Sequence, residues 1–369
     1  MTGRHARRPP IPFPVVLAAL VAAVVGLLVA GRGGAGPGDP SGATAAAGAS
    51  RAPQRAPGGT NGTGTKPGGA AGSPAVSGAI GGTTAVRRTL LIHGTGDVSL
   101  DPDYIPAFRS NGYGWAWSGL GGLFRRDDLT VVNLECPATD VVDPVVKQFV
   151  FRCDPAALPV ARRFGVDVMN QSNNHAFDQG PDGLLDSLRR IRAAGLTPVG
   201  AGANQAQALR PALFDLEGWR VAVLGFDEVL DPVYEVAGAD RPGTAAGHDV
   251  SLMVQAVRRA AAQADLVVVM IHWGVELDTQ PRPYQVQEGH ALIDAGADVI
   301  FGGHSHRLQP LSMYRGRPIF WSLGNFVWPH LSTEGSTTAV AEVRVTPTGR
   351  YLARLLPATI VSDGHPVLG

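Results

Sequence analysis

The sequence predicts an α/β protein in which a sheet with crossover helices packs against a second sheet with antiparallel edges. Short runs rich in Val and Ile, typical of strands, alternate with longer helical patterns between residues 155 and 302. Between residues 318 and 357, three strand-like runs follow one another without helices. Side chains of the kinds that bind metals follow five of the strands, which predicts that they gather at one edge of a sheet.

The beginning of the chain predicts a membrane anchor. Residues 1–10 are basic, and residues 11–31 carry no charge and form an apolar run long enough to cross a bilayer as a helix. We therefore expect a cytoplasmic tail, a single transmembrane anchor and a C-terminal domain outside the cell membrane. A cleaved signal peptide is the alternative interpretation.

The next segment is expected to be a disordered tether. Residues 32–85 consist mainly of Gly, Ala, Pro, Ser and Thr. Such a segment buries too little apolar surface to offset the entropy of ordering. One folded domain, residues 86–369, is expected to follow. The whole chain has 31 basic and 31 acidic residues, so its charge gives no reason to expect a nucleic-acid partner.

Within the folded domain, periodicity predicts each element in turn. The segments with helical patterning are residues 155–164, 181–194, 248–264 and 283–295. Three of them have a proline near the start, where its missing N–H is harmless. The segments with strand patterning are residues 89–93, 129–132, 166–170, 220–226, 265–272, 299–302, 318–323, 337–345 and 351–357. The last three are expected to form the second sheet.

Five strand ends carry residues of types that commonly bind metals. In chain order these residues are Asp97, Glu135, Asn174 with His175, His272, and the pair His304 and His306. Two loop histidines one residue apart are weak evidence by themselves, because such residues are often simply solvated. Ligands collect outside the carboxyl ends of strands in α/β sheets, so the joint pattern predicts one shared site.

Two cysteines, Cys136 and Cys153, lie in the folded domain, and the chain has no others. Because this domain is expected outside the cytoplasm, a disulfide between them is the favoured interpretation. Two buried thiols or a metal-binding pair are the alternatives.

These motifs, taken in order, resemble the CapA family, the bacterial capsule synthesis or poly-γ-glutamate capsule biosynthesis family. They are Gly96-Asp97, Asn133-Leu134-Glu135, Asn173-Asn174-His175 with Asp178, His272-Trp273-Gly274 with Glu276, His304-x-His306 with Gln309, and Ser322-Leu323-Gly324-Asn325-Phe326. The resemblance implies a calcineurin-like metallophosphoesterase fold with two packed mixed β-sheets flanked by helices, an α/β/β/α arrangement.

The resemblance also implies a site for two divalent metal ions bridged by Glu135. The first ion would be held by Asp97, Glu135 and His306, and the second by Glu135, Asn174, His272 and His304. Carboxylates and imidazoles with an amide oxygen suit Mn, Zn or Fe. One departure concerns the first ion: Asp97 is followed by Val98 and Ser99 where phosphoesterases usually carry Asp-x-His. The first ion therefore lacks one expected histidine.

Further residues near these motifs have more than one interpretation. His175 is expected either to act as a general acid or to stabilise charge on a leaving oxygen, and Asp178 either orients its ring or caps the next helix. Glu276 either binds metal or substrate or is a solvated loop carboxylate. Arg307 either binds an anionic substrate or lies on the surface. Asn325 either contacts substrate or holds a loop by hydrogen bonds.

Two classes of function follow from this site. In the first, the protein is a membrane-anchored, metal-dependent hydrolase or transferase that acts on an anionic extracellular polymer or phosphoester. In the second, it is a non-catalytic, polymer-binding component of a capsule export complex with a structural metal site. Both classes allow contacts with other membrane proteins of capsule synthesis, and the nearly complete ligand set favours the first.

Overall fold

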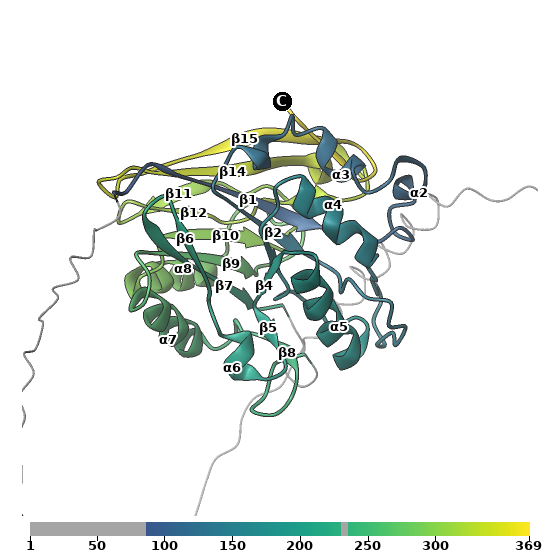
Figure 1. The fold of residues 1–369 in the computed structure, drawn as a ribbon, viewed down its shortest axis with the longest axis horizontal. Helices are drawn as coiled ribbons and strands as arrows, with labels where there is room; N and C mark the ends of the chain where they lie inside the picture. Colours follow the sequence, from purple (N-terminus) through teal and green to yellow (C-terminus); the bar gives the residue numbers. More distant parts are fainter. Residues whose placement is uncertain (1–85, 230–234) are drawn as a thin grey trace, which may run out of the picture. The chain divides into compact units, whose positions relative to one another are not determined.

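The computed structural model describes residues 86–229 and 235–369 (Figure 1). The segments 1–10, 11–31 and 32–85, interpreted above as tail, anchor and tether, lie outside the described residues. Among the residues that are described, no helix has both the length and the apolar character needed to span a membrane.

The larger sheet has eight strands and combines both ends of the folded domain. Its order is β16-β15-β14-β1-β2-β3-β4, and β13 also pairs with β1. These strands are β1 (Leu90–Val98), β2 (Leu129–Leu134), β3 (Val168–Asn170), β4 (Thr197–Val199), β13 (Asn325–Val327), β14 (Thr337–Val345), β15 (Tyr351–Ser362) and β16 (His365–Leu368). The four strands from β1 to β4 run parallel, whereas β14 is antiparallel to β1.

The smaller main sheet has six strands in the order β11-β12-β10-β9-β7-β6. These strands are β6 (Ala212–Leu216), β7 (Trp219–Asp227), β9 (Leu266–His272), β10 (Val299–Gly303), β11 (Leu311–Tyr314) and β12 (Arg317–Phe320). Strands β7, β9, β10 and β12 run parallel, and β6 and β11 pair antiparallel at the two edges. A separate two-stranded sheet joins β5 (Ala201–Gly202) and β8 (Gly243–Thr244).

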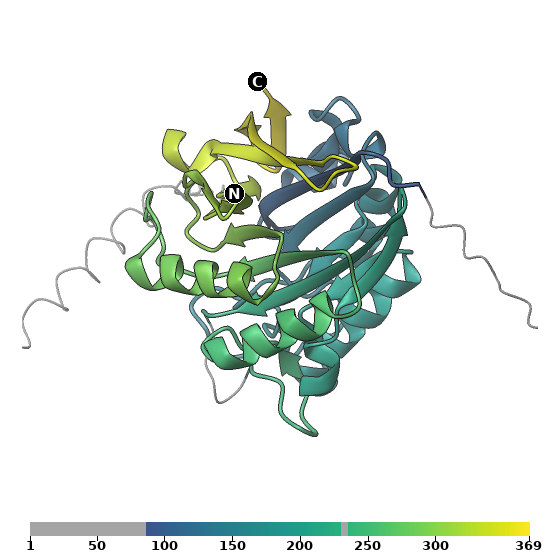
Figure 2. The ribbon, with the colours of Figure 1, turned by 90° about the vertical axis from the view of Figure 1, so that its left-hand side faces the viewer.

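The two main sheets pack face to face between outer layers of helices (Figure 2). Successive strand residues point to opposite faces, as Val131 and Val132 do. Val131 joins a core shared with Val268 of the other sheet, whereas Val132 packs with helical residues such as Leu158. The helices are α2 (Ala107–Asn111), α3 (Trp115–Ser118), η1 (Leu123–Arg125), η2 (Pro155–Ala157), α4 (Leu158–Arg163), α5 (Gly180–Ala193), α6 (Gln205–Ala208), α7 (Val250–Ala261), α8 (Pro283–Ala295) and α9 (Thr333–Ser336).

The mixed α/β class and the presence of several sheets are therefore confirmed, but one expectation about the sheets is wrong. The runs 318–323, 337–345 and 351–357 do not form a sheet of their own. The first supplies β12, which extends the parallel strands of the six-stranded sheet, and the other two supply β14 and β15, which extend the sheet of β1. Each sheet is thus mixed: β14, β15 and β16 pair antiparallel in the larger sheet, and β6 and β11 are the antiparallel edge strands of the smaller one.

Candidate metal centre

The carboxyl ends of β1, β2, β9 and β10 bring the predicted ligands to one place. Asp97 lies near the end of β1, where the pairing of β1 with β2 shifts between Gly94 and Asp97. Such irregularities redirect side chains at the ends of strands. Asp97 pairs with Asn325 of β13 on its other side. One residue next to the site, Asn325, therefore comes from a strand that lies far later in the sequence.

Two glycines allow the strands to approach this closely. A Cβ on Gly96 would lie 1.8 Å from the carbonyl oxygen of Gly324, and Asp97 N donates to that same oxygen at 2.9 Å. A Cβ on Gly303 would lie 2.6 Å from Asp97 Oδ1. Glycine is thus required at both positions for steric reasons, and the backbone of Leu323-Gly324-Asn325 supports β1 directly.

Asp97 is fully buried and is held in its charged form by its neighbours. Asn133 Nδ2 donates to Asp97 Oδ1 at 2.9 Å, and His306 Nδ1 lies 3.3 Å from Asp97 Oδ2. Burial raises the pKa of Asp97, but the hydrogen bond and charge of His306, together with the hydrogen bond from Asn133, outweigh that effect and lower it to about 2. Asp97 is therefore an ionised oxygen donor at neutral pH.

Glu135 is also fully buried, but among the described residues neither carboxylate oxygen has a hydrogen-bond partner. Burial, followed by the negative charge of Asp97, raises the pKa of Glu135 well above its usual range. Its Oε1 lies 3.6 Å from His272 Nε2 and 4.0 Å from His306 Nε2. A buried carboxylate is costly without a counter-charge, so this geometry favours a cation beside Glu135.

His272 lies next to both Glu135 and Asn174. Asn133 Nδ2 lies 3.0 Å from His272 Nδ1. His272 Nε2 faces Asn174 Oδ1 at 2.9 Å. Burial lowers the pKa of His272 well below its usual range, so the ring is neutral, as a metal ligand must be.

The pair His304 and His306 turns toward the same space because both residues have positive φ angles, 88° and 52°. Such backbone is uncommon for a side-chain-bearing residue, and two instances in one turn mark a constrained loop. The rings of His304 and His272 are 4.9 Å apart. Burial and the charge of His306 lower the pKa of His304 to about 4, and its Nδ1 has no partner among the described residues.

The donor set therefore fits a divalent cation. Ligand atoms of Asp97, Glu135 and His272 lie within 4.8 Å of one another, and all three residues are buried. Asn174, His304 and His306 reach the same space through the contacts given above. Carboxylate and imidazole ligands favour Mn, Zn or Fe over Mg or Ca.

His175 stands next to these residues and is held by Asp178. His175 Nδ1 lies 2.7 Å from Asp178 Oδ2, so its Nε2 is the nitrogen left for a substrate. Asp178 is fully buried, and its Oδ2 also accepts from Phe151 N at 2.7 Å. The carboxylate thus fixes the orientation of the ring. It does not cap α5, whose N-terminal capping position is Gln179.

Lys147 is a residue of this site that the sequence analysis missed. Its Nζ lies 3.0 Å from Asp178 Oδ1 and 2.9 Å from Glu235 Oε1, and it also donates to the carbonyl oxygen of Asn174. Lys147 lies on a loop between β2 and η2 that has no periodic pattern, so no sequence signal selected it. It connects the carboxylate that orients His175 to the backbone of a predicted ligand.

A hollow of about 220 Å³ opens beside the ligand cluster. His175, His306 and Arg307 line it, as do the exposed Glu276 and the buried Asn325. Asn325 Oδ1 lies 2.8 Å from His306 Nδ1, and its Nδ2 donates to Gly335 O at 3.0 Å. Asn325 therefore holds loops together, which leaves Glu276 and Arg307 as the charged side chains available to a ligand. The remaining lining is largely apolar and includes Tyr104, Phe149, Phe151, Leu277, Trp328 and Leu331.

A disulfide joins Cys136 to Cys153, with their Cα atoms 5.6 Å apart. Cys136 directly follows Glu135, and Leu100 N lies 2.9 Å from Cys153 Sγ. The bond therefore ties the segment after β2 to the segment before η2, next to the ligand cluster.

Comparison with known proteins places the chain in a family. A family model described as bacterial capsule synthesis protein PGA_cap matches residues 92–330, well over half of the 369 residues. The chain belongs to this family. The matched range contains every residue of the candidate metal centre and of the hollow except Leu331, Ser332 and Gly335.

Several relatives with names that refer to capsule, PGA or polyglutamine synthesis match part of this chain. The chain is 33% identical over 234 residues to "PGA biosynthesis protein CapA" of Bacillus subtilis, a match that covers 62% of this chain and 61% of that one. It is 35% identical over 209 residues to "Capsule biosynthesis protein CapA" of Bacillus anthracis, covering 55% and 49%. It is 30% identical over 246 residues to a "Probable polyglutamine synthesis accessory protein" of Mycobacterium tuberculosis, covering 63% and 64%. The chain thus spans about half to just under two thirds of these curated relatives.

Solved structures are more distantly similar. The NAD nucleotidase of Haemophilus influenzae matches with a TM-score of 0.46 and 14% identity over 73% of this chain and 50% of that one. The 5'-nucleotidase of Candida albicans matches with a TM-score of 0.44 and 13% identity over 73% and 51%. Likenesses of this size carry no conclusion about activity.

Proposed function

We propose that this protein is a metal-dependent hydrolase of capsule or poly-γ-glutamate synthesis. The observation that carries the proposal is the convergence of Asp97, Glu135 and His272, with both oxygens of the buried Glu135 lacking partners among the described residues. A structural zinc site is usually closed by four protein ligands, whereas this cluster adjoins an open hollow lined by His175.

The residues divide into those that hold metal and those that act on substrate. The metal-holding group is Asp97, Glu135, Asn174, His272, His304 and His306. When bound, divalent cations supply Lewis acidity that polarises an ester oxygen and lowers the pKa of a water. His175 donates a proton from Nε2 to the leaving oxygen, while Asp178 accepts from Nδ1 and stabilises the cationic ring. Arg307 binds a carboxylate or phosphate of the substrate at the mouth of the hollow.

The substrate class and location belong to the same proposal. We infer an anionic extracellular polymer or phosphoester as substrate, because the relatives are named for capsule and polyglutamine synthesis. We further infer that residues 11–31 hold the domain outside the cytoplasmic membrane, where other membrane proteins of capsule synthesis would be its partners. Protease added to intact spheroplasts should then remove the domain, and full protection of the domain would contradict this location.

The activity is tested on the full chain with three measurements made in parallel. These are metal content, hydrolysis of p-nitrophenyl phosphate and hydrolysis of a γ-linked glutamate oligomer. Asp97→Ala should lose metal and activity together. His175→Ala should keep metal and lose about 10²–10⁴-fold in turnover, the usual contribution of a general acid. Metal binding without hydrolysis of either compound would replace this proposal with the non-catalytic polymer-binding role.

A further inference from the structure

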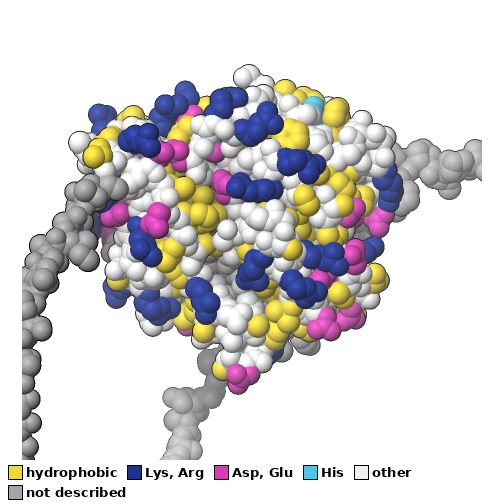
Figure 3. Space-filling model, in the orientation of Figure 1, with side chains coloured by type: hydrophobic (Ala, Val, Ile, Leu, Met, Phe, Trp, Pro, Cys, Tyr) yellow, Lys and Arg dark blue, Asp and Glu magenta, His cyan; other side chains and the backbone are white. Residues whose placement is uncertain are grey.

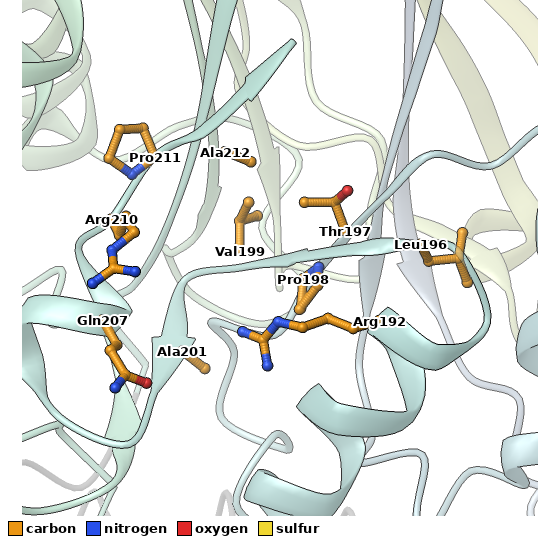
Figure 4. A pocket seen from close by; sticks show the side chains of 10 residues that line it. All are labelled: Arg192, Leu196, Thr197, Pro198, Val199, Ala201, Gln207, Arg210, Pro211 and Ala212. Atoms are coloured by element: carbon orange, nitrogen blue, oxygen red, sulfur yellow. The ribbon is translucent and has the colours of Figure 1, made fainter.

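A second hollow, of about 320 Å³, lies where the edges of the two main sheets meet. Strand β4 is the edge strand of one sheet and β6 is the edge strand of the other. The hollow shares no lining residue with the metal centre or its hollow. Its lining consists of Arg192, Leu196, Thr197, Pro198, Val199, Ala201, Gln207, Arg210, Pro211 and Ala212 (Figure 4). We call it the Arg192/Arg210 hollow.

Two guanidinium groups face this hollow, and no acidic residue lines it. Figure 4 shows the side chains of Arg192 and Arg210 on opposite sides of the hollow, with Arg210 extending toward Gln207. Among the described residues, Arg192 Nη1 donates only to Leu188 O at 3.3 Å, and the side chain of Arg210 has no hydrogen bond or ion pair. Both charges are therefore available to a ligand.

Other arginines on the same helix are paired with an acidic side chain, unlike Arg192. Arg189 and Arg190, on α5 like Arg192, both pair with Asp186. Lys and Arg side chains are also spread over the face of the molecule that carries β4, β6 and α6, with fewer Asp and Glu among them (Figure 3). The field over this face therefore favours anions.

Neutral donors complete the lining. Gln207 Oε1 accepts from Ala203 N at 3.2 Å, which leaves its Nε2 free to donate into the hollow. The hydroxyl of Thr197 has no hydrogen-bond partner within the described part of the chain and lies on the same wall. Guanidinium, amide and hydroxyl donors together match the oxygens of a carboxylate.

The hollow is poorly suited to binding an added β-strand. Pro198 is the middle residue of the edge strand β4, and Pro211 directly precedes the edge strand β6. Proline lacks the N–H needed for a sheet ladder and is typical of protected edges. An occupant would therefore be recognised by the side chains that line the hollow.

We propose that the Arg192/Arg210 hollow binds carboxylate groups of the anionic polymer at a distance from the metal centre. Arginine forks bind carboxylates in pairs of parallel hydrogen bonds, and two forks can grip successive carboxylates of one chain. A second contact on the same molecule raises the effective concentration of polymer at the first site. The substrate class, but not the site, rests on the function proposed above.

The test measures polymer binding in the absence of metal. A fluorescent γ-linked glutamate oligomer is titrated with the chelator-treated full chain, and binding is followed by anisotropy. Replacing both arginines, R192A with R210A, should weaken binding about tenfold or more, since charge-assisted hydrogen bonds are lost. The matched control replaces Arg258 and Arg259, two exposed arginines of α7 without ion pairs among the described residues. It removes the same charge and should change binding less than twofold.

Several outcomes overturn the proposal. Equal losses in the two double variants would show that net charge, not this hollow, binds the oligomer. Displacement of the oligomer by inorganic phosphate at lower concentrations than by glutarate would identify a phosphate site. If the double variant does not fold, R192A and R210A singly should each weaken binding about threefold, and wild-type binding by both would refute the site. Because metal is absent throughout, failure of the hydrolase proposal leaves this measurement unaffected.

Discussion

Glu135 has a buried carboxylate whose two oxygens lack protein partners within the described residues. In the metal-free protein, Glu135→Gln should therefore raise stability by about 1–3 kcal/mol, because a neutral amide costs less to bury than a carboxylate. With metal present, the same variant should bind less metal and lose the stabilisation that metal provides. Thermal unfolding with chelator and with added Mn²⁺, together with metal analysis, measures both effects.

Glu342→Gln serves as the control for Glu135→Gln, since Glu342 is also buried but is paired with arginines. Its metal content should equal that of the wild type. A Glu135→Gln variant that binds wild-type amounts of metal would remove Glu135 from the ligand set.

Lys147 is expected to support both the proton donor and a ligand. Lys147→Met would leave Asp178 without its cation and the Asn174 carbonyl without a donor. We expect a loss of about 1–3 kcal/mol in stability and weaker metal binding, because buried polar groups lose their partners. Unfolding by urea and metal titration measure these effects. Lys147→Arg should restore part of both, and wild-type metal affinity in Lys147→Met would contradict the role.

For single residues, the sequence predicted those at or just after the ends of strands and missed Lys147, which lies in the long loop between β2 and η2. Asp97, Glu135, His272 and His304 each follow an apolar run, and the topology brings such positions together at one sheet edge. Lys147 follows no periodic segment, and its contacts depend on how one loop folds over the site. The proposed roles in binding metal and substrate remain predictions.

Among the elements, the β14–β15 pair carries a charge cluster that is sensitive to pH. Glu342 of β14 lies opposite Arg354 of β15, and its Oε1 accepts from Arg354 Nε at 2.8 Å and Arg344 Nε at 3.0 Å. Burial raises the pKa of Glu342, but these hydrogen bonds outweigh it and lower the pKa to about 2. A lowered carboxylate pKa stabilises the fold above the usual value of 4.5 and loses that effect as pH falls toward 2.

Glu342→Gln should therefore cost about 0.5–1 kcal/mol at pH 7, a small value because both arginines are about half exposed. The difference between wild type and variant should shrink as pH falls from about 5 to about 2. Urea unfolding at pH 7, 5 and 3 measures it. A difference that stays constant over this range would show that the ionised form is not the stabilising one.

The sequence predicted most elements well and their partners poorly. The predicted helix 283–295 and strand 337–345 coincide with α8 and β14. Strand β1 instead runs on to Val98, because the shifted pairing near Asp97 keeps it in the sheet beyond the predicted end at residue 93. The periodicity of apolar residues indicates which face of a strand is buried, but it does not indicate which other strand pairs with it. The assignment of β14 and β15 to a separate sheet failed for that reason.

For the molecule as a whole, the disulfide between Cys136 and Cys153 closes a loop with a sequence separation of 17. Replacing both cysteines by serine should lower stability by about 3 kcal/mol in the chain-entropy model. Dithiothreitol should lower the unfolding temperature of the wild type and leave that of the double variant unchanged. Equal responses of the two proteins to the reductant would argue against a stabilising bond.

The pairing of β1 with β13 and β14 also limits when the domain can fold and bind metal during its synthesis. Asp97 is synthesised early in translation. Asn325 and the backbone of Gly324, which support Asp97, are synthesised only near the end of translation. Contacts so distant in sequence form late and slow the approach to the native state. Metal ions would therefore be loaded after translation of almost the whole domain, and a nascent chain interrupted before β13 would carry ligands that have no site.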